Sequence, residues 1–166
     1  RIVLEKGYDV FVEVVKKIEN EKVVFIVIGD GEYLPKMKSE LLIEEKQRKV
    51  FFLGFRTDVI TFLNGCDICL MTSYHETLCM SLVEAAYKGL ALVASNVGGV
   101  KEVIEEEKNG FLVNVGNVDQ FVRRIKYLAN NPEILQRMKN ESKIYAERWF
   151  SPELIEGQLD RLYKSI

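Results

Sequence analysis

The sequence predicts an α/β fold in which helices flank an open, doubly wound, mostly parallel sheet. Short apolar runs rich in Val, Ile and Phe alternate with longer segments whose apolar residues recur every three or four positions. The short runs are continuous rather than alternately polar, which is typical of strands covered on both faces. Most of the runs also end in glycine or small polar residues, as strands do where they turn towards a helix.

Five apolar runs are candidate strands, at residues 23–28, 50–53, 68–71, 91–95 and 111–113. The first, Val23 to Ile28, contains no polar residue, so we expect it to be buried on both faces. The last follows the turn signal Asn109-Gly110. Ahead of all five, Ile2 to Leu4 resembles the end of a strand whose beginning is absent. We therefore expect the chain to be part of a longer protein.

The remaining segments have helical spacing or helical end signals, at about residues 9–19, 33–46, 58–64, 78–88, 102–106, 118–128, 134–148 and from 151 onward. Asp9 is the expected N-cap of the first helix, and Thr57 or Asp58 that of the third. Ser151 is the expected N-cap of the last helix, with Pro152 at its first position. Regular alternation of these helices with the strands supports the parallel sheet.

Composition excludes several classes of protein. With 166 residues, 48% of them hydrophobic and 29% charged, the chain is long enough for one large globular domain. A formal net charge of −2 gives no basic face for nucleic acid. No apolar run approaches the roughly 18–20 residues that span a bilayer. The odd number of cysteines, 3, is no disulfide framework and favours a reducing, cytoplasmic location.

The cysteines could also be interpreted as part of a zinc site, with ligands Cys66, Cys69, His75 and Cys79. However, Cys69 lies inside a predicted strand and Cys79 opens a predicted helix, and the glycine-rich turns of small zinc modules are missing. Small buried side chains are the better interpretation of these cysteines.

The corners after the strands should form one site, because the carboxyl ends of parallel strands share one edge of a sheet. These corners are residues 1–7, 29–32, 54–58, 73–80 and 96–99. Free amides at the start of the helix near Leu78 suit a phosphate, and Arg1 and Lys6 would add positive charge. Glu76 and Glu84 would lie roughly 10 Å apart if their spacing is helical. That separation suits the two ends of an extended ligand better than an acid/base pair.

Several segments in order resemble the C-terminal, donor-binding domain of the family 4 glycosyltransferases, which are retaining enzymes of GT-B fold. They are residues 1–7, 25–31, 50–55, the Glu76-x7-Glu84 motif with its continuation to Gly89, 96–102 and 109–113. The resemblance covers essentially all 166 residues, and the Glu76-x7-Glu84 motif is its strongest part. It implies a Rossmann-like nucleotide-sugar domain at residues 1–166, with the N-terminal acceptor domain absent.

The resemblance implies transfer of a hexosyl or N-acetylhexosaminyl group from a nucleoside-diphosphate sugar to a glycan or lipid-linked acceptor, with retention. Arg1 and Lys6 would hold the diphosphate, Glu76 would contact the transferred sugar, and Glu84 would bind the ribose. Further donor-binding positions would be Gly29, Gly31, Phe55, Arg56, Thr77, Leu78, Cys79 and Met80. Backbone near Phe55 would meet the base. No metal or cofactor is implied, because cationic side chains and amides take the role of a divalent ion.

The resemblance also implies a role in polysaccharide biosynthesis, in the cytoplasm or at the cytoplasmic membrane face. Thr77 and Cys79 stand where the family often has glycine or proline, so the phosphate loop should be bulkier here. We expect the chain alone to bind donor weakly and to transfer nothing. The alternatives are an epimerase or a phosphorylase of the same architecture and a non-catalytic relic. A single histidine, the lack of a pyridoxal-phosphate lysine segment, and intact Glu76 and Glu84 argue against them in turn.

Overall fold

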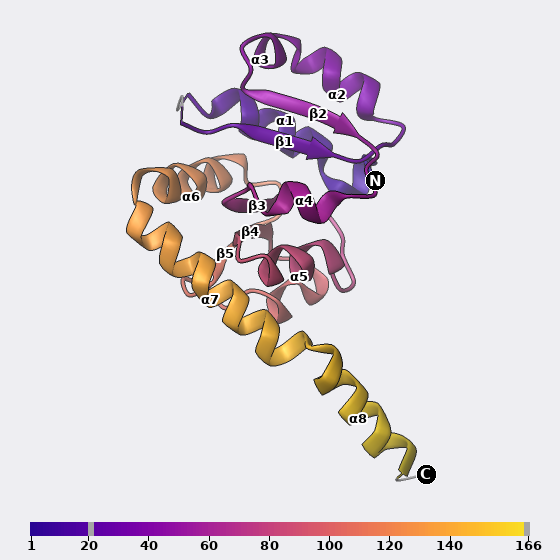
Figure 1. Ribbon diagram of the computed structural model, residues 1–166. Coiled ribbons are helices and arrows are strands. Elements are labelled where there is room, and N and C mark those ends of the chain that lie inside the picture. The colour runs from indigo at the N-terminus through magenta and orange to yellow at the C-terminus, as the bar shows by residue number, and fades with distance from the viewer. Residues whose placement is uncertain (20–21, 165–166) are drawn as a thin grey trace.

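The computed structural model describes residues 1–19 and 22–164 (Figure 1). Its strands are β1 (Phe25–Ile28), β2 (Val50–Gly54), β3 (Ile68–Met71), β4 (Ala91–Ser95) and β5 (Gly110–Val113). Its helices are α1 (Tyr8–Lys17), α2 (Leu34–Glu40), α3 (Leu42–Lys46), α4 (Val59–Leu63), α5 (Met80–Tyr87), α6 (Val118–Asn130), α7 (Pro132–Phe150) and α8 (Pro152–Lys164). Two 3-10 turns are η1 (Leu4–Lys6) and η2 (Gly98–Glu102).

All strand pairings are parallel, which confirms the predicted fold class, but the described strands form two sheets instead of one. β1 pairs with β2, with Phe25 opposite Val50, and β3, β4 and β5 pair in that order. In Figure 1, α2 and α3 lie beyond the first sheet, whereas α5 and α7 lie against the second. The carboxyl ends of the strands in each sheet therefore share an edge, as the sequence predicted.

The segment at residues 2–5 joins the two sheets at that edge. The Ile2 amide donates to the Asp30 carbonyl (2.8 Å), and the Tyr33 amide donates to the Ile2 carbonyl (3.2 Å). The Tyr74 amide donates to the Glu5 carbonyl (2.9 Å). The segment thus lies between the corner after β1 and the corner after β3. The segment is not a strand, because Leu4–Lys6 form the 3-10 turn η1. The strand end expected at residues 2–4 is therefore wrong as secondary structure, although the segment lies at the predicted edge of the sheet.

The core is densest around β4, whose five residues are all buried and which contacts α5, α6 and α7. β1 differs from the prediction that it is buried on both faces, since Ile26 is 42% exposed and the neighbouring Val24 is 53% exposed. Apolar composition alone does not say which face is covered. The larger apolar cluster is centred on α1 and α6, and includes Val12, Ile18 and Phe121.

Several element boundaries differ from the sequence predictions. The helix expected over 33–46 is divided at the fully buried Leu41 into α2 and α3. The N-cap of α1 is Gly7 with φ 64°, not Asp9, and the turn expected over 102–106 is η2, four residues earlier. At the C-terminal end the Leu154 amide donates to Ser151 Oγ (3.2 Å), which confirms the predicted cap. From there α8 extends away from the body (Figure 1).

Candidate functional site

A cavity of about 350 Å³ lies at the shared edge, between the carboxyl ends of β1 and β3. Its polar wall contains Arg1, Lys6, Ser73, Glu76 and Ser81. The apolar wall of the cavity is formed by both sheets, by the helices α1 and α2 and by the segment before η1. Its residues are Ile2, Tyr8, Phe11, Ile26, Val27, Ile28, Met37, Leu70 and Met71. A larger cavity of about 520 Å³ lies at the opposite ends of β1 and β2, beside Arg48 and Lys49, and contains none of the predicted site residues.

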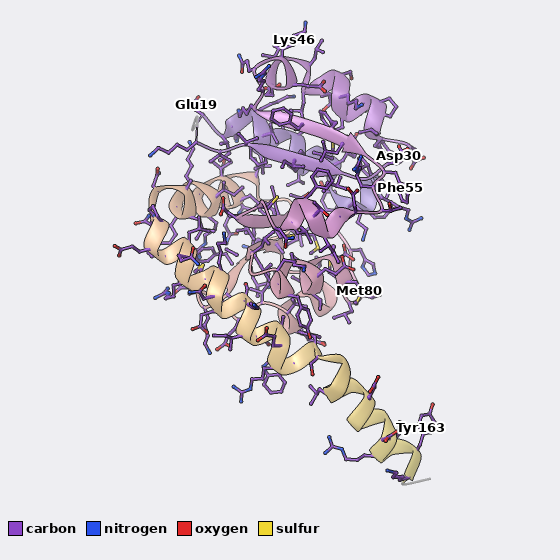
Figure 2. All side chains as sticks on the ribbon, in the orientation of Figure 1. Glu19, Asp30, Lys46, Phe55, Met80 and Tyr163 are labelled. Carbon is purple, nitrogen blue, oxygen red and sulfur yellow. The ribbon has the colours of Figure 1, made fainter. Side chains whose placement is uncertain are left out.

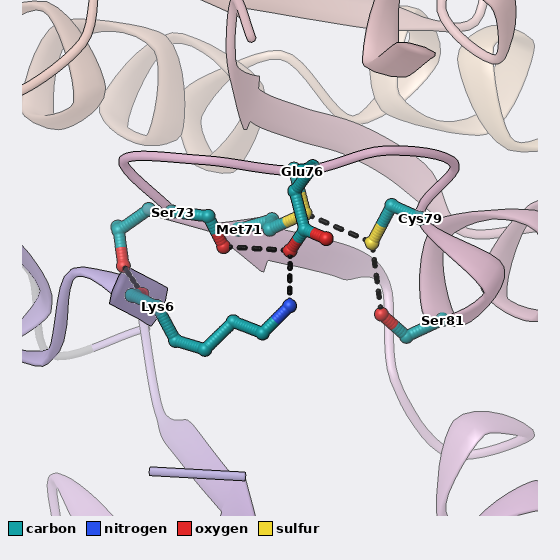
Figure 3. Close-up of polar contacts among 7 residues, drawn as sticks. Lys6, Met71, Ser73, Glu76, Cys79 and Ser81 are labelled. Carbon is teal, nitrogen blue, oxygen red and sulfur yellow. Dashed lines mark hydrogen bonds and ion pairs between the residues drawn. The ribbon is translucent and has the colours of Figure 1, made fainter. Parts of the chain in front are cut away.

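An ion pair between Lys6 and Glu76 stands in the polar wall (Figure 3). Lys6 Nζ lies 2.7 Å from Glu76 Oε1, and Ser73 Oγ donates to the same oxygen at 2.8 Å. The Glu76 side chain is 8% exposed and the Lys6 side chain 38%. The two residues that the sequence placed at opposite parts of the donor, on the sugar and on the diphosphate, therefore contact each other in this structure.

The loop carrying Glu76 is fastened to the start of α1. Thr72 Oγ donates to the Gly7 carbonyl (2.8 Å), and Tyr74 Oη donates to Asp9 Oδ2 (2.7 Å). This hydrogen bond, together with burial, raises the pKa of Tyr74 to about 12. Gly7 fits closely here, because a β-carbon at its position would overlap the Thr72 carbonyl. These contacts explain how residues distant in sequence bring Lys6 and Glu76 together.

Free amides precede α5, which begins at Met80 and not at Leu78 as predicted. The backbone amides of Leu78 to Ser81 have no acceptor among the described residues, as the first turn of a helix requires. The Leu78 and Met80 side chains are 42% and 57% exposed. Cys79 is buried, with Sγ 3.0 Å from Met71 Sδ, so only its backbone can meet a ligand. The arrangement can accept an anion at the helix start.

Glycines hold the loop before α5 against the loop after β4. A β-carbon at Gly98 would overlap the Glu76 carbonyl, and one at Gly99 would overlap the Thr77 carbonyl. The Gly99 amide donates to the Thr77 carbonyl (2.7 Å). Gly98 and Gly99 thus form a tight backbone crossing with the loop that carries Glu76. Thr77 itself is exposed beside the free amides.

The corners after β1 and β2 contain the remaining predicted positions. Gly29, with φ 134°, has open space around it, whereas Gly31 is packed against the Ile2 backbone and has a structural role. Phe55 is 76% exposed and lies on the same side of the molecule as Asp30 (Figure 2). The Arg56 guanidinium binds both Asp58 oxygens at 2.8 Å, so its side chain is already engaged.

Comparison with known proteins decides the family. The family model for glycosyl transferases group 1 matches residues 1–145. The chain belongs to the group 1 glycosyl transferases. Its parallel α/β architecture matches solved GT-B glycosyltransferases, as the sequence predicted.

Two curated relatives and one solved structure illustrate the match of this group 1 glycosyl transferase chain. An uncharacterized glycosyltransferase of Haemophilus influenzae is 30% identical over 131 residues, covering 78% of this chain and 37% of the relative. The Escherichia coli UDP-Gal:alpha-D-GlcNAc-diphosphoundecaprenol alpha-1,3-galactosyltransferase is 27% identical. The match covers 74% of this chain and 33% of that enzyme. The Anabaena protein Alr3699/HepE, crystallised in complex with UDP-glucose, is 25% identical with a TM-score of 0.91. The match covers 100% of this chain and 47% of the Anabaena protein. The chain thus spans less than half the length of each of these proteins.

Two further predicted site residues of this glycosyl transferase chain, Glu84 and Arg1, make no hydrogen bond or ion pair with Lys6 or Glu76. Glu84 is exposed on α5, and its carboxylate has no partner among the described residues. Arg1 is exposed at the cavity, likewise without a side-chain partner in the described part of the chain. The unpaired carboxylate and guanidinium are available to a ligand.

Sequence reasoning missed the part that Ser73 has in the site. Its side chain is 1% exposed and its hydroxyl donates to Glu76, three residues later. The available signal was a serine at the corner after β3, in a position that a parallel sheet places beside the motif.

No group of metal-ligating side chains lies among the described residues, and no described helix is long and apolar enough to cross a membrane. All three cysteines are free. Cys79 is buried as expected, whereas Cys66 and Cys69 are only partly buried.

Proposed function

We propose that residues 1–166 form the donor-binding domain of a retaining glycosyltransferase. It moves a hexosyl or N-acetylhexosaminyl group from a nucleoside-diphosphate sugar to a glycan or lipid-linked acceptor, which a separate domain binds. The observation that carries the proposal is a cavity lined by the Lys6–Glu76 pair and by Ser81, in the first turn of α5, where the backbone amides are free. UDP-glucose bound to Alr3699/HepE and the diphosphoundecaprenol substrate named for the Escherichia coli relative support the donor and acceptor classes.

The diphosphate of the donor would lie at the start of α5. Amides of Leu78 to Met80 donate to its oxygens, and the helix dipole favours the negative charge. Arg1 and Lys6 add positive charge that stabilises the departing nucleoside diphosphate. Attack and departure on the same face of the sugar require mainly positioning and electrostatic stabilisation, and both come from groups already in place.

The other positions follow from their exposure. Glu84 binds the ribose hydroxyls, for which its unpaired carboxylate is suited. Phe55 and the open backbone at Gly29 meet the base. Arg56 contributes only through its backbone, because its guanidinium holds Asp58. Free cysteines and the relatives in glycan assembly support a cytoplasmic location, at or near the membrane face.

Titration of UDP, GDP and ADP by calorimetry tests the site. We expect one of them to bind, and Glu84→Ala to weaken that binding at least about tenfold, or about 1.4 kcal/mol. Glu133→Ala, which removes an exposed carboxylate at the start of α7, is the matched control and should leave binding unchanged. Equal binding by Glu84→Ala and the unmodified protein would remove Glu84 from the ribose role. Failure of every nucleotide to bind would refute the proposed function.

The chain alone should bind donor weakly and transfer nothing, because the acceptor side of the site is outside it. Incubation with UDP-sugars and a defined lipid-linked acceptor, followed by mass spectrometry, checks this expectation. Product formed by the 166-residue chain would contradict it.

A further inference from the structure

We propose that Ser73 is a positioning residue for the donor sugar, holding Glu76 Oε1 so that Oε2 is presented to a sugar hydroxyl. The inference rests on the proposed function and adds to it the atom that binds the sugar. Figure 3 shows the arrangement, with Ser73 and Lys6 directed at the same carboxylate oxygen of Glu76.

The two carboxylate oxygens of Glu76 differ in their hydrogen-bond partners. Oε1 accepts from Lys6 Nζ at 2.7 Å and from Ser73 Oγ at 2.8 Å. Oε2 has no partner among the described residues, although the side chain is only 8% exposed. Because an ionised carboxylate only accepts hydrogen bonds, Ser73 must be the donor in its pair. Oε2 is not fully buried and Glu76 lines the cavity, so a ligand or a water molecule there can donate a hydrogen bond to it.

Ser73 is a firmer anchor for Glu76 than Lys6 is. Ser73 is 1% exposed, and its neighbours on both sides are fastened to the segment before α1. Thr72 Oγ donates to the Gly7 carbonyl, and the Tyr74 amide donates to the Glu5 carbonyl. Its position therefore does not depend on Glu76.

Lys6 has a competing partner, since its ammonium is also the charge that the diphosphate of the donor requires. When the donor binds, Lys6 is shared between the diphosphate and Glu76 or moves to the diphosphate. The Ser73 hydrogen bond is then what keeps Oε1 in place and Oε2 facing the sugar. Because Lys6 is shared in this way, Ser73 is the residue that positions Glu76 when the donor is bound.

The arrangement also defines the substrate class at this point of the site. Oε2 can accept a hydrogen bond but cannot donate one, so it selects a sugar that presents a free hydroxyl there. A site built to bind a hydroxyl rejects the analogue that lacks it far more strongly than an apolar pocket rejects an extra methylene. A donor with hydrogen or fluorine in place of that hydroxyl should therefore bind little better than the nucleotide alone.

The test compares nucleotide and nucleotide-sugar affinities in the intact protein by calorimetry. The readout is the ratio of the Kd for UDP to the Kd for the tightest of UDP-glucose, UDP-galactose and UDP-N-acetylglucosamine. We expect Ser73→Ala to lower this ratio about tenfold and to change the UDP affinity less than twofold. Ser73→Cys, which keeps a side chain of similar size and a weak donor, should give a ratio between those of Ser73→Ala and the unmodified protein. The matched control is Ser142→Ala, which removes an equally buried serine that donates to the Asn109 carbonyl and should leave the ratio unchanged.

A double variant shows whether Ser73 acts through Glu76. If it does, Ser73→Ala should add no further loss in a Glu76→Ala background. Additive losses, or equal weakening of UDP and UDP-sugar by Ser73→Ala, would overturn the inference while leaving the proposed function intact. If GDP or ADP binds in place of UDP, the same ratio is measured with the corresponding nucleotide sugars. Failure of UDP, GDP and ADP alike to bind the unmodified protein would instead overturn the proposed function. If Ser73→Ala does not fold, Ser73→Cys carries the same comparison.

Discussion

Replacing Lys6 by alanine should lower the free energy of unfolding by about 2 kcal/mol. The Glu76 carboxylate, 8% exposed, would keep only the neutral hydroxyl of Ser73 as a donor. Removing one partner of a fully buried ion pair costs about 3–5 kcal/mol, and an exposed pair contributes about 0–1 kcal/mol. Since the Lys6 side chain is 38% exposed, water can reach Oε1 in the variant, and the expected loss lies between these limits.

Urea denaturation followed by far-ultraviolet circular dichroism measures this loss. The matched control is Lys17→Ala, because Lys17 forms a pair of similar length with Asp119 (2.8 Å) with side-chain exposures of 50% and 68%. Its loss should be far smaller than that of Lys6→Ala, because solvent screens an exposed pair. A second change, Glu76→Gln, should restore part of the loss in the Lys6→Ala protein by removing the uncompensated charge. Equal losses for the two lysine variants would show that burial of Glu76 does not strengthen its pair.

Two further predictions concern the contacts between the site loop and α1. The hydrogen bond to Asp9 and burial raise the pKa of Tyr74 from 10.0 to about 12. The neutral phenol therefore stabilises the fold fully below about pH 10, and this stabilisation is lost as the pH rises through about 12. Tyr74→Phe should therefore flatten the decline in urea midpoint between pH 9 and pH 11.5, and parallel declines would contradict this. Gly7→Ala and Gly54→Ala both place a side chain at φ near 65°, at about 1–2 kcal/mol. Only Gly7→Ala also meets a carbonyl, that of Thr72, so its melting temperature should fall much further, and similar falls would refute the close fit.

The order and type of most elements could be predicted because apolar period and end signals act locally. Ser151 illustrates this, as its side chain caps the next helix as expected. The division between α2 and α3 could not be predicted, since residues 33–46 have continuous helical character. Burial of Leu41 depends on the opposing core, which no local pattern reveals. The exposure of Ile26 has the same origin, because composition identifies an apolar side chain without identifying its cover.

The site was predictable to the level of the sheet edge. A parallel topology brings Lys6 and Glu76 to one corner although they are 70 residues apart in sequence. The convergence of Lys6 and Ser73 on a single oxygen depends on side-chain rotamers and could not be predicted. Arg56 shows the opposite case, because Asp58, two residues later, already indicated a partner that would engage its guanidinium.

The division of the sheet has a consequence for handling the protein. Within the described chain β1 pairs only with β2, and β3 only with β4, so each has an edge with free amides and carbonyls. Ile26, 42% exposed on β1, adds apolar surface beside one of these edges. Open edges of this kind are templates for strands from other molecules.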